Sequence, residues 1–196
     1  MTVSAGAPID DVKWARIDWD RARSVVRRLR MRIAKAVKES RWGKVRSLRQ
    51  LLSHSFYAKL LAVKRVTSNK GKKTPGIDGV LWQGVRAKSQ AVYGMRRRGY
   101  RPLPLRRIYI PKKNGKLRPL SIPCMMDRAQ QALYKLALAP VAETLADRNS
   151  YGFRKCRGCA DAIAAAFNAL SKPNSAPWVL EADIKGCYDN ISHDWM

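Results

Sequence analysis

An aspartate near the end of a short apolar run is the residue of this sequence best placed to do chemistry. The run occupies residues 179–184, and a Lys-Gly turn follows Asp183. An apolar run with one acid near its end predicts a buried strand that delivers a carboxylate to its C-terminal edge. Because a buried, unpaired carboxylate is costly, such an acid normally has a partner or a metal ion. A helix N-cap or a salt-bridged aspartate is the alternative.

The positive charge of the chain is concentrated in its front part. The net charge is +26, and thirty lysines and arginines but only two acids, Glu39 and Asp78, lie between Arg21 and Met126. From Asp127 onwards, eight acids balance eight bases. An ordinary solvated surface would intersperse both signs. We therefore infer that the chain binds nucleic acid, held mainly by its basic front.

Composition also limits where the protein works. No apolar run approaches the ~20 residues needed to span a bilayer, and the polar, acidic N-terminus is unlike a signal peptide. Four cysteines do not make a disulfide framework in a chain of 196 residues. Cys156 and Cys159 have the spacing of half a zinc site, but no second pair accompanies them. We expect a reduced, cytoplasmic, bacterial protein with no membrane partner.

The chain divides into four segments. We expect a disordered leader over residues 1–12, a basic helical segment over 13–68, a loop and hairpin over 69–126, and a less basic segment over 127–196. Apolar residues at three- and four-residue steps predict the helices. The first carries Val25, Val26, Leu29, Ile33, Ala36 and Val37, and the second, after a break at residues 40–43, carries Val45, Leu48, Leu52, Phe56, Leu60 and Val63.

Three more helices are predicted further along the chain. One covers residues 84–98 and ends at Gly99. Another has Asp127 as its N-cap and a new turn starting at Pro140. The third is alanine-rich and covers residues 161–170.

Two stretches between the helices contain turn residues. Residues 69–79 predict a loop, because Gly and Pro punctuate them. Residues 106–123 predict a β-hairpin, in which two β-prone arms flank Lys-Asn-Gly and Asn-Gly accepts the positive φ of a tight turn. Prolines at positions 111, 119 and 123 predict edge strands.

Four motifs in this order resemble those of group II intron reverse transcriptase/maturases. They are the Asn-Lys-Gly and Pro-Gly-Ile-Asp-Gly loop (69–79), the basic hairpin (106–123), Tyr-Gly-Phe-Arg (151–154), and Asp-Ile-Lys-Gly followed by Asp-Asn-Ile (183–191). The resemblance covers residues 14–196. It implies an α+β fold with a basic helical N-terminal extension, fingers that carry a β-hairpin, and the first part of a right-hand polymerase palm.

The resemblance also implies roles for single residues. Asp183 would bind catalytic Mg²⁺, with the Ile184 carbonyl assisting, since hard cations prefer oxygen ligands. Lys112 and Arg118 would face the triphosphate of a deoxynucleotide; of the two, Arg118 is the stronger candidate because its guanidinium bridges phosphate oxygens. Tyr188 would stack under the sugar and exclude a 2′-hydroxyl.

Template contacts follow in the same way. Residues that would contact RNA template or primer are Asn69, Lys70, Lys72, Lys73, Arg106, Arg107, Arg154 and Arg157. The last two could instead brace the palm, and both alternatives stay open. Cys156 stands where the family has Gly and Gly158 where it has Ser, which leaves the local backbone open because cysteine resists positive φ.

The intact family copies RNA into DNA and assists splicing of its intron, so the expected partners are intron RNA, an RNA template with a DNA primer, and deoxynucleoside triphosphates. The family's second acidic motif, an aromatic residue followed by Ala-Asp-Asp, does not occur in these residues. We therefore expect the chain to be inactive alone, as a truncated gene product, a fragment, or one half of a split protein whose C-terminal half is separately encoded. One alternative is a non-catalytic RNA-binding module that assists splicing. Another is part of a retron, diversity-generating or CRISPR-associated reverse transcriptase.

Overall fold

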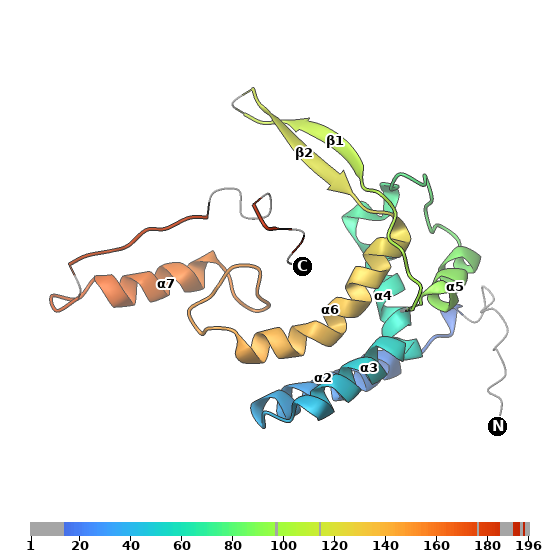
Figure 1. Cartoon of the computed structure of the whole chain (residues 1–196), viewed down its shortest axis with the longest axis horizontal. Coiled ribbons are helices and arrows are strands. Elements are labelled where there is room, and N and C mark those ends of the chain that lie inside the picture. Colours follow the sequence, from blue (N-terminus) through green and yellow to red (C-terminus); the bar gives the residue numbers. More distant parts are fainter. Residues whose placement is uncertain are drawn as a thin grey trace. The chain divides into compact units, whose positions relative to one another are not determined.

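The computed structural model (Figure 1) describes residues 14–96, 98–113, 115–175, 177–184, 190–192 and 194. They divide into two units between Ala146 and Asp147. The first unit contains α2 (Trp19–Lys38), α3 (Trp42–His54), α4 (Phe56–Ser68), the short 3₁₀ helix η1 (Lys70–Lys73), α5 (Val85–Gly94), β1 (Arg106–Pro111), β2 (Leu117–Ile122) and α6 (Met125–Leu145). The second unit contains α7 (Cys159–Leu170).

Five described helices of the first unit contribute side chains to one apolar core. Helix α6 packs against α4, α2 and α3, while α5 joins the group through α4. The largest fully buried side chains there include Ile33, Leu52, Leu60, Met125 and Leu133. Burying each stabilises the fold by about 1.5–3 kcal/mol relative to leaving it in water. The basic residues of these amphipathic helices are therefore left on the outside.

Helix α2 forms where the apolar periodicity predicts it. Asp18 caps it, accepting a hydrogen bond of 2.8 Å from the Arg21 amide, and Lys35 and Lys38 lie in its last turn, where a helix favours positive charge. Ahead of it, the Trp14 and Trp19 rings meet edge to face, and Lys64 of α4 lies 3.9 Å over Trp19. The tryptophans thus tie the entry of α2 to the core.

The single helix predicted from Val45 to Val63 is wrong, because the structure has two. Ser55 is extended and separates α3 from α4: its amide bonds to the Leu52 carbonyl, and its own carbonyl accepts from Lys59. Of the predicted apolar positions, those on both sides of the break are buried except Phe56, which is 41% exposed. Periodicity alone therefore gives no sign of an interruption one residue long.

Three further helix bounds differ from the prediction. Helix α5 ends at Gly94, since the next residue, Met95, leaves the helix to bury its side chain. Cys124, not Asp127, is the N-cap of α6, while Asp127 lies in the first turn and accepts a hydrogen bond from the Tyr100 hydroxyl. Pro140 does not start a new turn, because α6 continues through it to Leu145.

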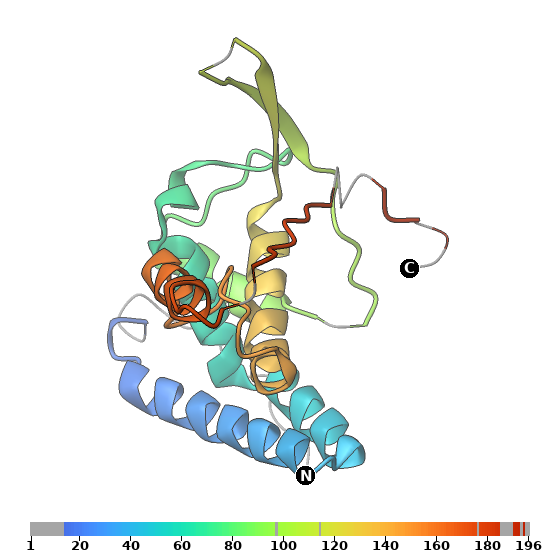
Figure 2. The ribbon, with the colours of Figure 1, turned by 90° about the vertical axis from the view of Figure 1, so that its left-hand side faces the viewer.

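The β-hairpin is confirmed as an antiparallel pair that projects from the helices of its unit (Figures 1 and 2). Arg106 pairs with Ile122 at its base, and the Lys112 amide bonds to the Lys116 carbonyl near its tip. Gly115 takes the positive φ of the turn, at 75°, while Asn114 lies outside the described residues.

The prolines of the hairpin stand at positions that do not bond across the ladder. Backbone bonds alternate along an antiparallel pair, so the bond between Lys112 and Lys116 places Pro111 and Pro119 at non-hydrogen-bonded positions. Their missing N–H groups therefore remove no bond between the two strands. Both strands are edges of a two-stranded sheet, as the prolines predict.

The second unit contains α7 and an extended segment without a ladder. The predicted strand from Val179 is wrong over the described residues, because 177–184 form no strand and Leu180 is 92% exposed. A strand needs hydrogen-bonded neighbours, and β1 with β2 is the sheet that the described residues form. In the described part of the chain, no helix combines the length and apolar composition needed to cross a membrane.

Candidate nucleic-acid interface

The loop after α4 presents exposed bases on a short, defined turn. Asn69 ends α4 with an extended backbone, and its carbonyl accepts from the Lys72 amide at 3.2 Å, which starts η1. The side chains of Asn69, Lys70, Lys72 and Lys73 are all exposed. Within the described residues, none of the three lysines has a carboxylate partner, which leaves their charges available for a polyanion.

Arg128 of α6 holds this loop to the base of the hairpin. Its guanidinium donates to three backbone carbonyls: Nη1 to Gly71 at 2.9 Å, Nη2 to Thr74 at 2.7 Å, and Nε to Pro123 at 2.8 Å. Charge-assisted hydrogen bonds of this length are stronger than neutral ones. One side chain therefore fixes the loop, the end of β2 and the start of α6 together.

Gly76 brings the loop and the hairpin base into direct backbone contact. A Cβ atom at this position would lie 2.6 Å from Cα and 2.6 Å from Sγ of Cys124, much closer than real Cβ atoms approach. The Cys124 side chain is itself buried. Only glycine fits here, because any side chain would push the loop away from the N-cap of α6.

The hairpin register gathers the predicted phosphate-binding residues on one face. Opposed residues of an antiparallel pair share a face, and residues two apart along a strand do as well. Arg118 lies opposite Ile110, and Lys112 follows Ile110 by two positions. Lys112 and Arg118 are thus diagonal neighbours on the face that also carries Arg106, and both are exposed. Arg107 lies on the other face.

In the second unit, the predicted RNA-binding arginines contact their own loop. Arg154 donates to the carbonyls of Asp147 and Ser150, the latter at 3.0 Å. Arg157 donates to the Arg148 carbonyl, and its guanidinium lies 5.6 Å from the Tyr151 ring centre. Both arginines thus brace the loop that carries them.

Cys156 takes a left-handed backbone, with φ at 56°. The family's glycine would adopt this conformation freely, whereas a side chain costs roughly 1–2 kcal/mol. Cys156 therefore holds, at the cost of strain, a backbone conformation that glycine adopts freely. At Gly158 the amide donates to the Asp161 carboxylate at 2.7 Å, which caps α7.

The predicted metal ligands do not form a metal site in the described residues. Asp183 and Ile184 are exposed, and Tyr188 lies outside the described residues. No group of three or more His, Cys, Asp or Glu side chains that could hold a metal ion occurs in the described part of the chain. A two-metal centre needs several carboxylates, so Asp183 as described supplies one oxygen donor group and no more.

Two successive segments of the chain match known protein families. Residues 14–95 match the family described as the N-terminal domain of reverse transcriptase, and residues 110–196 match the family described as reverse transcriptase (RNA-dependent DNA polymerase). The chain belongs to the reverse transcriptases. The braced loop lies within the first match, and most of the hairpin lies within the second.

Several relatives of this reverse transcriptase chain are intron-encoded. It is 38% identical over 142 residues to protein YkfC of Escherichia coli K12, covering 68% of this chain and 37% of that protein. It is 35% identical over 154 residues to the group II intron-encoded protein LtrA of Lactococcus lactis, covering 76% and 24%. It is 32% identical over 140 residues to the putative COX1/OXI3 intron 1 protein of Saccharomyces cerevisiae, covering 69% and 16%. The chain thus spans about a third or less of these relatives' lengths.

Sequence patterns missed the residues that assemble the interface of this reverse transcriptase. Arg128 follows the predicted N-cap Asp127 and reads as an ordinary helix residue, while its carbonyl partners lie up to 57 positions away. Gly76 reads as a loop glycine, although what it contacts is Cys124. Neither partner can be found from local spacing, because both contacts join segments distant in sequence.

Proposed function

We propose that this chain is the RNA-holding part of a group II intron-encoded RNA-directed DNA polymerase and maturase. The observation that carries the proposal is the ordered pair of family matches over a loop and hairpin that share one brace at Arg128. Relatives named as intron-encoded proteins support the intron connection. The intact enzyme would work in the bacterial cytoplasm on intron RNA, an RNA template with a DNA primer, and deoxynucleoside triphosphates.

The roles proposed for the interface follow its geometry. The exposed Lys70, Lys72 and Lys73 contact template phosphates, since such contacts hold a strand without selecting its sequence. Arg106 and Arg107 at the hairpin base extend this contact. The hairpin face that carries Lys112 and Arg118 holds the triphosphate, where a guanidinium bridges two oxygens and an ammonium provides a point charge.

Asn69 starts the turn that presents the loop lysines, and we propose that its exposed amide also reaches the template. Arg154 and Arg157 contribute to RNA binding through the loop they brace. Tyr188 is the proposed sugar gate that disfavours a 2′-hydroxyl.

Polymerisation is not a property we assign to this chain alone. By family, the Asp183 carboxylate and the Ile184 carbonyl are proposed Mg²⁺ ligands, but one carboxylate does not satisfy a hard cation that takes about six oxygens. The family's aromatic-Ala-Asp-Asp motif is not among these residues. We therefore propose that catalysis requires carboxylates supplied in addition to Asp183.

Primer extension on an RNA template in Mg²⁺ tests this proposal. The chain is assayed alone, then with a separately expressed polypeptide that carries the aromatic-Ala-Asp-Asp motif and thumb. Extension is expected only in the second case, and Asp183→Ala should abolish it. Extension by the chain alone that survives Asp183→Ala would refute the proposed metal ligand.

A non-catalytic splicing role is the second candidate, favoured by the thirty-to-two excess of bases over acids between Arg21 and Met126. In that case, the chain alone would accelerate splicing of a group II intron RNA at low Mg²⁺. The Asp183→Ala variant should then accelerate splicing as much as the unchanged chain does. If, in addition, no mixture extends a primer, the result would favour this role over that of a polymerase.

A further inference from the structure

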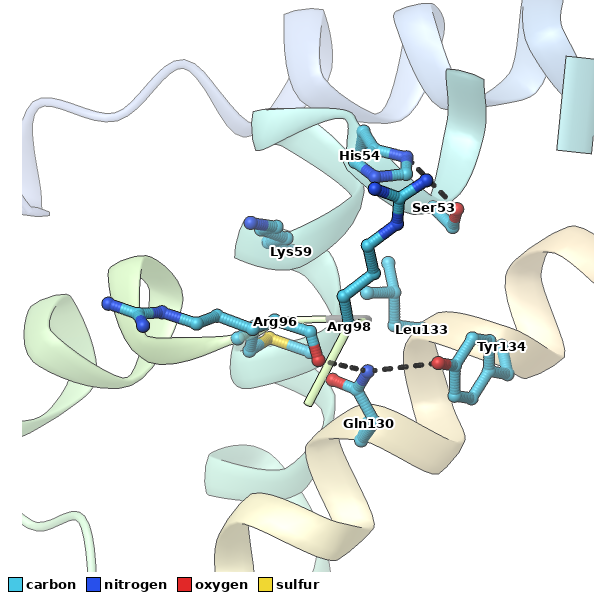
Figure 3. A pocket seen from close by; sticks show the side chains of 9 residues that line it. Ser53, His54, Lys59, Arg96, Arg98, Gln130, Leu133 and Tyr134 are labelled. Carbon is cyan, nitrogen blue, oxygen red and sulfur yellow. Dashed lines mark hydrogen bonds between the residues drawn. The ribbon is translucent and has the colours of Figure 1, made fainter. Parts of the chain in front are cut away.

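A second basic site lies on the side of α6 that faces away from Arg128. Gln130 follows Arg128 by two residues, which is about 200° around the helix, so the two side chains leave α6 in nearly opposite directions. There, a cavity of about 310 Å³ opens between the end of α3, the start of α4, the segment after α5, and α6 (Figure 3). Its lining includes Ser53, His54, Lys59, Arg98, Gln130 and Tyr134.

The charged groups of this cavity are all basic. Lys59 comes from α4 and Arg98 from the segment after α5, and Arg98 extends toward the side of the cavity formed by His54 (Figure 3). No carboxylate is among the lining residues. Burial lowers the pKa of Lys59, because its charge is partly removed from water without a nearby anion. An anionic ligand would supply the missing counter-charge.

Gln130 adds a second requirement for a ligand of this cavity, a hydrogen-bond donor. It is 2% exposed, and its Nε2 donates to the Arg96 carbonyl at 3.1 Å and to the Tyr134 hydroxyl at 3.3 Å. A carbonyl can only accept, so the bond to Arg96 fixes which end of the amide is nitrogen. The Oε1 atom is buried and has no hydrogen-bond donor among the described residues. Since a buried acceptor without a donor is costly, a ligand with a hydroxyl or amine donor would fit here.

Negative charge and a hydroxyl donor occur together in the RNA backbone. We propose that this cavity binds one nucleotide of an RNA strand, with its phosphate at Lys59 and Arg98 and its 2′-hydroxyl donating to Oε1 of Gln130. The volume lies at the lower end of the range for ligand pockets, ~300–1,000 Å³. A 2′-hydroxyl contact is a means by which a protein distinguishes RNA from DNA. The inference rests on the proposed function, which makes RNA the partner.

Neighbouring hollows continue the site in two directions. One shares His54 with the cavity and is lined by Arg28 and Arg32, among others. Another shares Ser53 and Tyr134 and is lined by Arg46 and Arg49. Neither contains a carboxylate. A strand that leaves the cavity on either side therefore meets further cations, as a phosphate backbone requires.

The first test removes the cations of the cavity. Lys59→Ala combined with Arg98→Ala is compared with Lys44→Ala combined with Arg86→Ala, a pair that removes the same charge from exposed positions that line none of the three hollows. Binding of a fluorescent single-stranded RNA is measured by anisotropy, and circular dichroism confirms that each variant is folded. The cavity pair should weaken binding at least about tenfold and the control pair less than about threefold.

The second test changes the ligand, so it needs no folded variant. One oligonucleotide sequence is made as RNA, as 2′-O-methyl RNA and as DNA. The 2′-O-methyl form keeps the oxygen but cannot donate, so the unchanged protein should bind RNA roughly three- to tenfold more tightly than either other form. Gln130→Met should remove this preference, whereas Gln131→Met, the same change at an exposed neighbour, should preserve it.

The outcomes separate this inference from the proposed function. If the unchanged protein binds no RNA, the proposed function fails. If it binds RNA but both charge-removal pairs weaken it equally, the cavity is not the site. Equal binding of RNA and 2′-O-methyl RNA by the unchanged protein would overturn the hydroxyl contact to Gln130.

Discussion

At the scale of single residues, positive charge has two different roles: one cation bonds to the main chain, and others stay exposed. Arg128 donates hydrogen bonds to the carbonyls of Gly71, Thr74 and Pro123, while the loop lysines beside them remain exposed. An exposed ion pair such as that of Arg23 with Asp20 contributes little stability. Arg128 therefore shapes the surface, and the ammonium groups of the loop lysines are left for a ligand.

Gly76→Ala should destabilise the first unit by about 1–3 kcal/mol, because the added methyl group overlaps the backbone of Cys124. Urea unfolding followed by circular dichroism measures the loss. Gly43→Ala is the matched control, since nothing lies within 4 Å of its Cβ position and it lies within α3. The control should be neutral or stabilising by up to about 1 kcal/mol. Equal effects of both changes would contradict the close contact.

Cys156→Gly should relieve strain in the second unit. The left-handed cysteine costs roughly 1–2 kcal/mol, and a glycine loses about 0.5–1 kcal/mol more backbone entropy on folding, so the net gain is about 0.5–1 kcal/mol. Amide hydrogen exchange between Asp147 and Gly158 should slow about two- to fivefold. Cys159→Gly, which removes a thiol where φ is not positive, should produce no such slowing.

At the scale of elements, the loop, hairpin and α6 act as one assembly with a single junction. The loop touches the hairpin base through Gly76 and Cys124, and Arg128 ties both to the first turn of α6. The loop, which is distant in sequence from the other two elements, thus keeps a fixed position where the hairpin joins α6. The rest of the hairpin, by contrast, is exposed along most of both strands.

Arg128→Lys should loosen this junction while keeping its charge. A lysine ammonium cannot bond three carbonyls in the planar arrangement of a guanidinium, so the loop should open more often. Limited trypsin digestion after Lys70, Lys72 and Lys73 should become at least about fivefold faster, which corresponds to about 1 kcal/mol. Arg65→Lys, near the end of α4, is the matched control and should leave the cleavage rate unchanged.

Elements that depend on local chemistry could be predicted from the sequence, whereas those that depend on distant partners could not. Helix α2 follows from its apolar spacing, and the hairpin follows from its arms and Gly115. The strand expected at Val179 failed because a strand is defined by its neighbours. Lys112 and Arg118 could be named from sequence, but their common face required the register.

At the scale of the whole molecule, the positive charge of the first unit is the main determinant that we expect for nucleic-acid binding. Thirty bases and two acids between Arg21 and Met126 give the first unit a strong positive field, which attracts nucleic acid of any sequence. No carboxylate lines the three basic hollows, and the phosphate contacts proposed for the loop and hairpin would add to those proposed there. Affinity should therefore come from counterion release more than from shape.

Binding of structured RNA should fall steeply as salt rises. If six or more phosphates are neutralised, affinity drops about 10³-fold or more between ~50 and ~200 mM salt, with a logarithmic slope near −0.9 per phosphate for duplex nucleic acid. Filter binding across a salt series gives the slope, and circular dichroism across the same series checks that the fold is retained. Affinity that is constant over this range would contradict the electrostatic interface.

The two prolines of the hairpin have a consequence beyond the fold. A projecting ribbon offers two open edges, where a strand from another molecule could add and start aggregation. Pro111 and Pro119 occupy positions whose N–H groups would otherwise point outward, one on each edge. Each edge thus lacks a donor that an incoming strand would need. The ribbon can remain exposed for nucleic acid and still resist pairing with copies of itself.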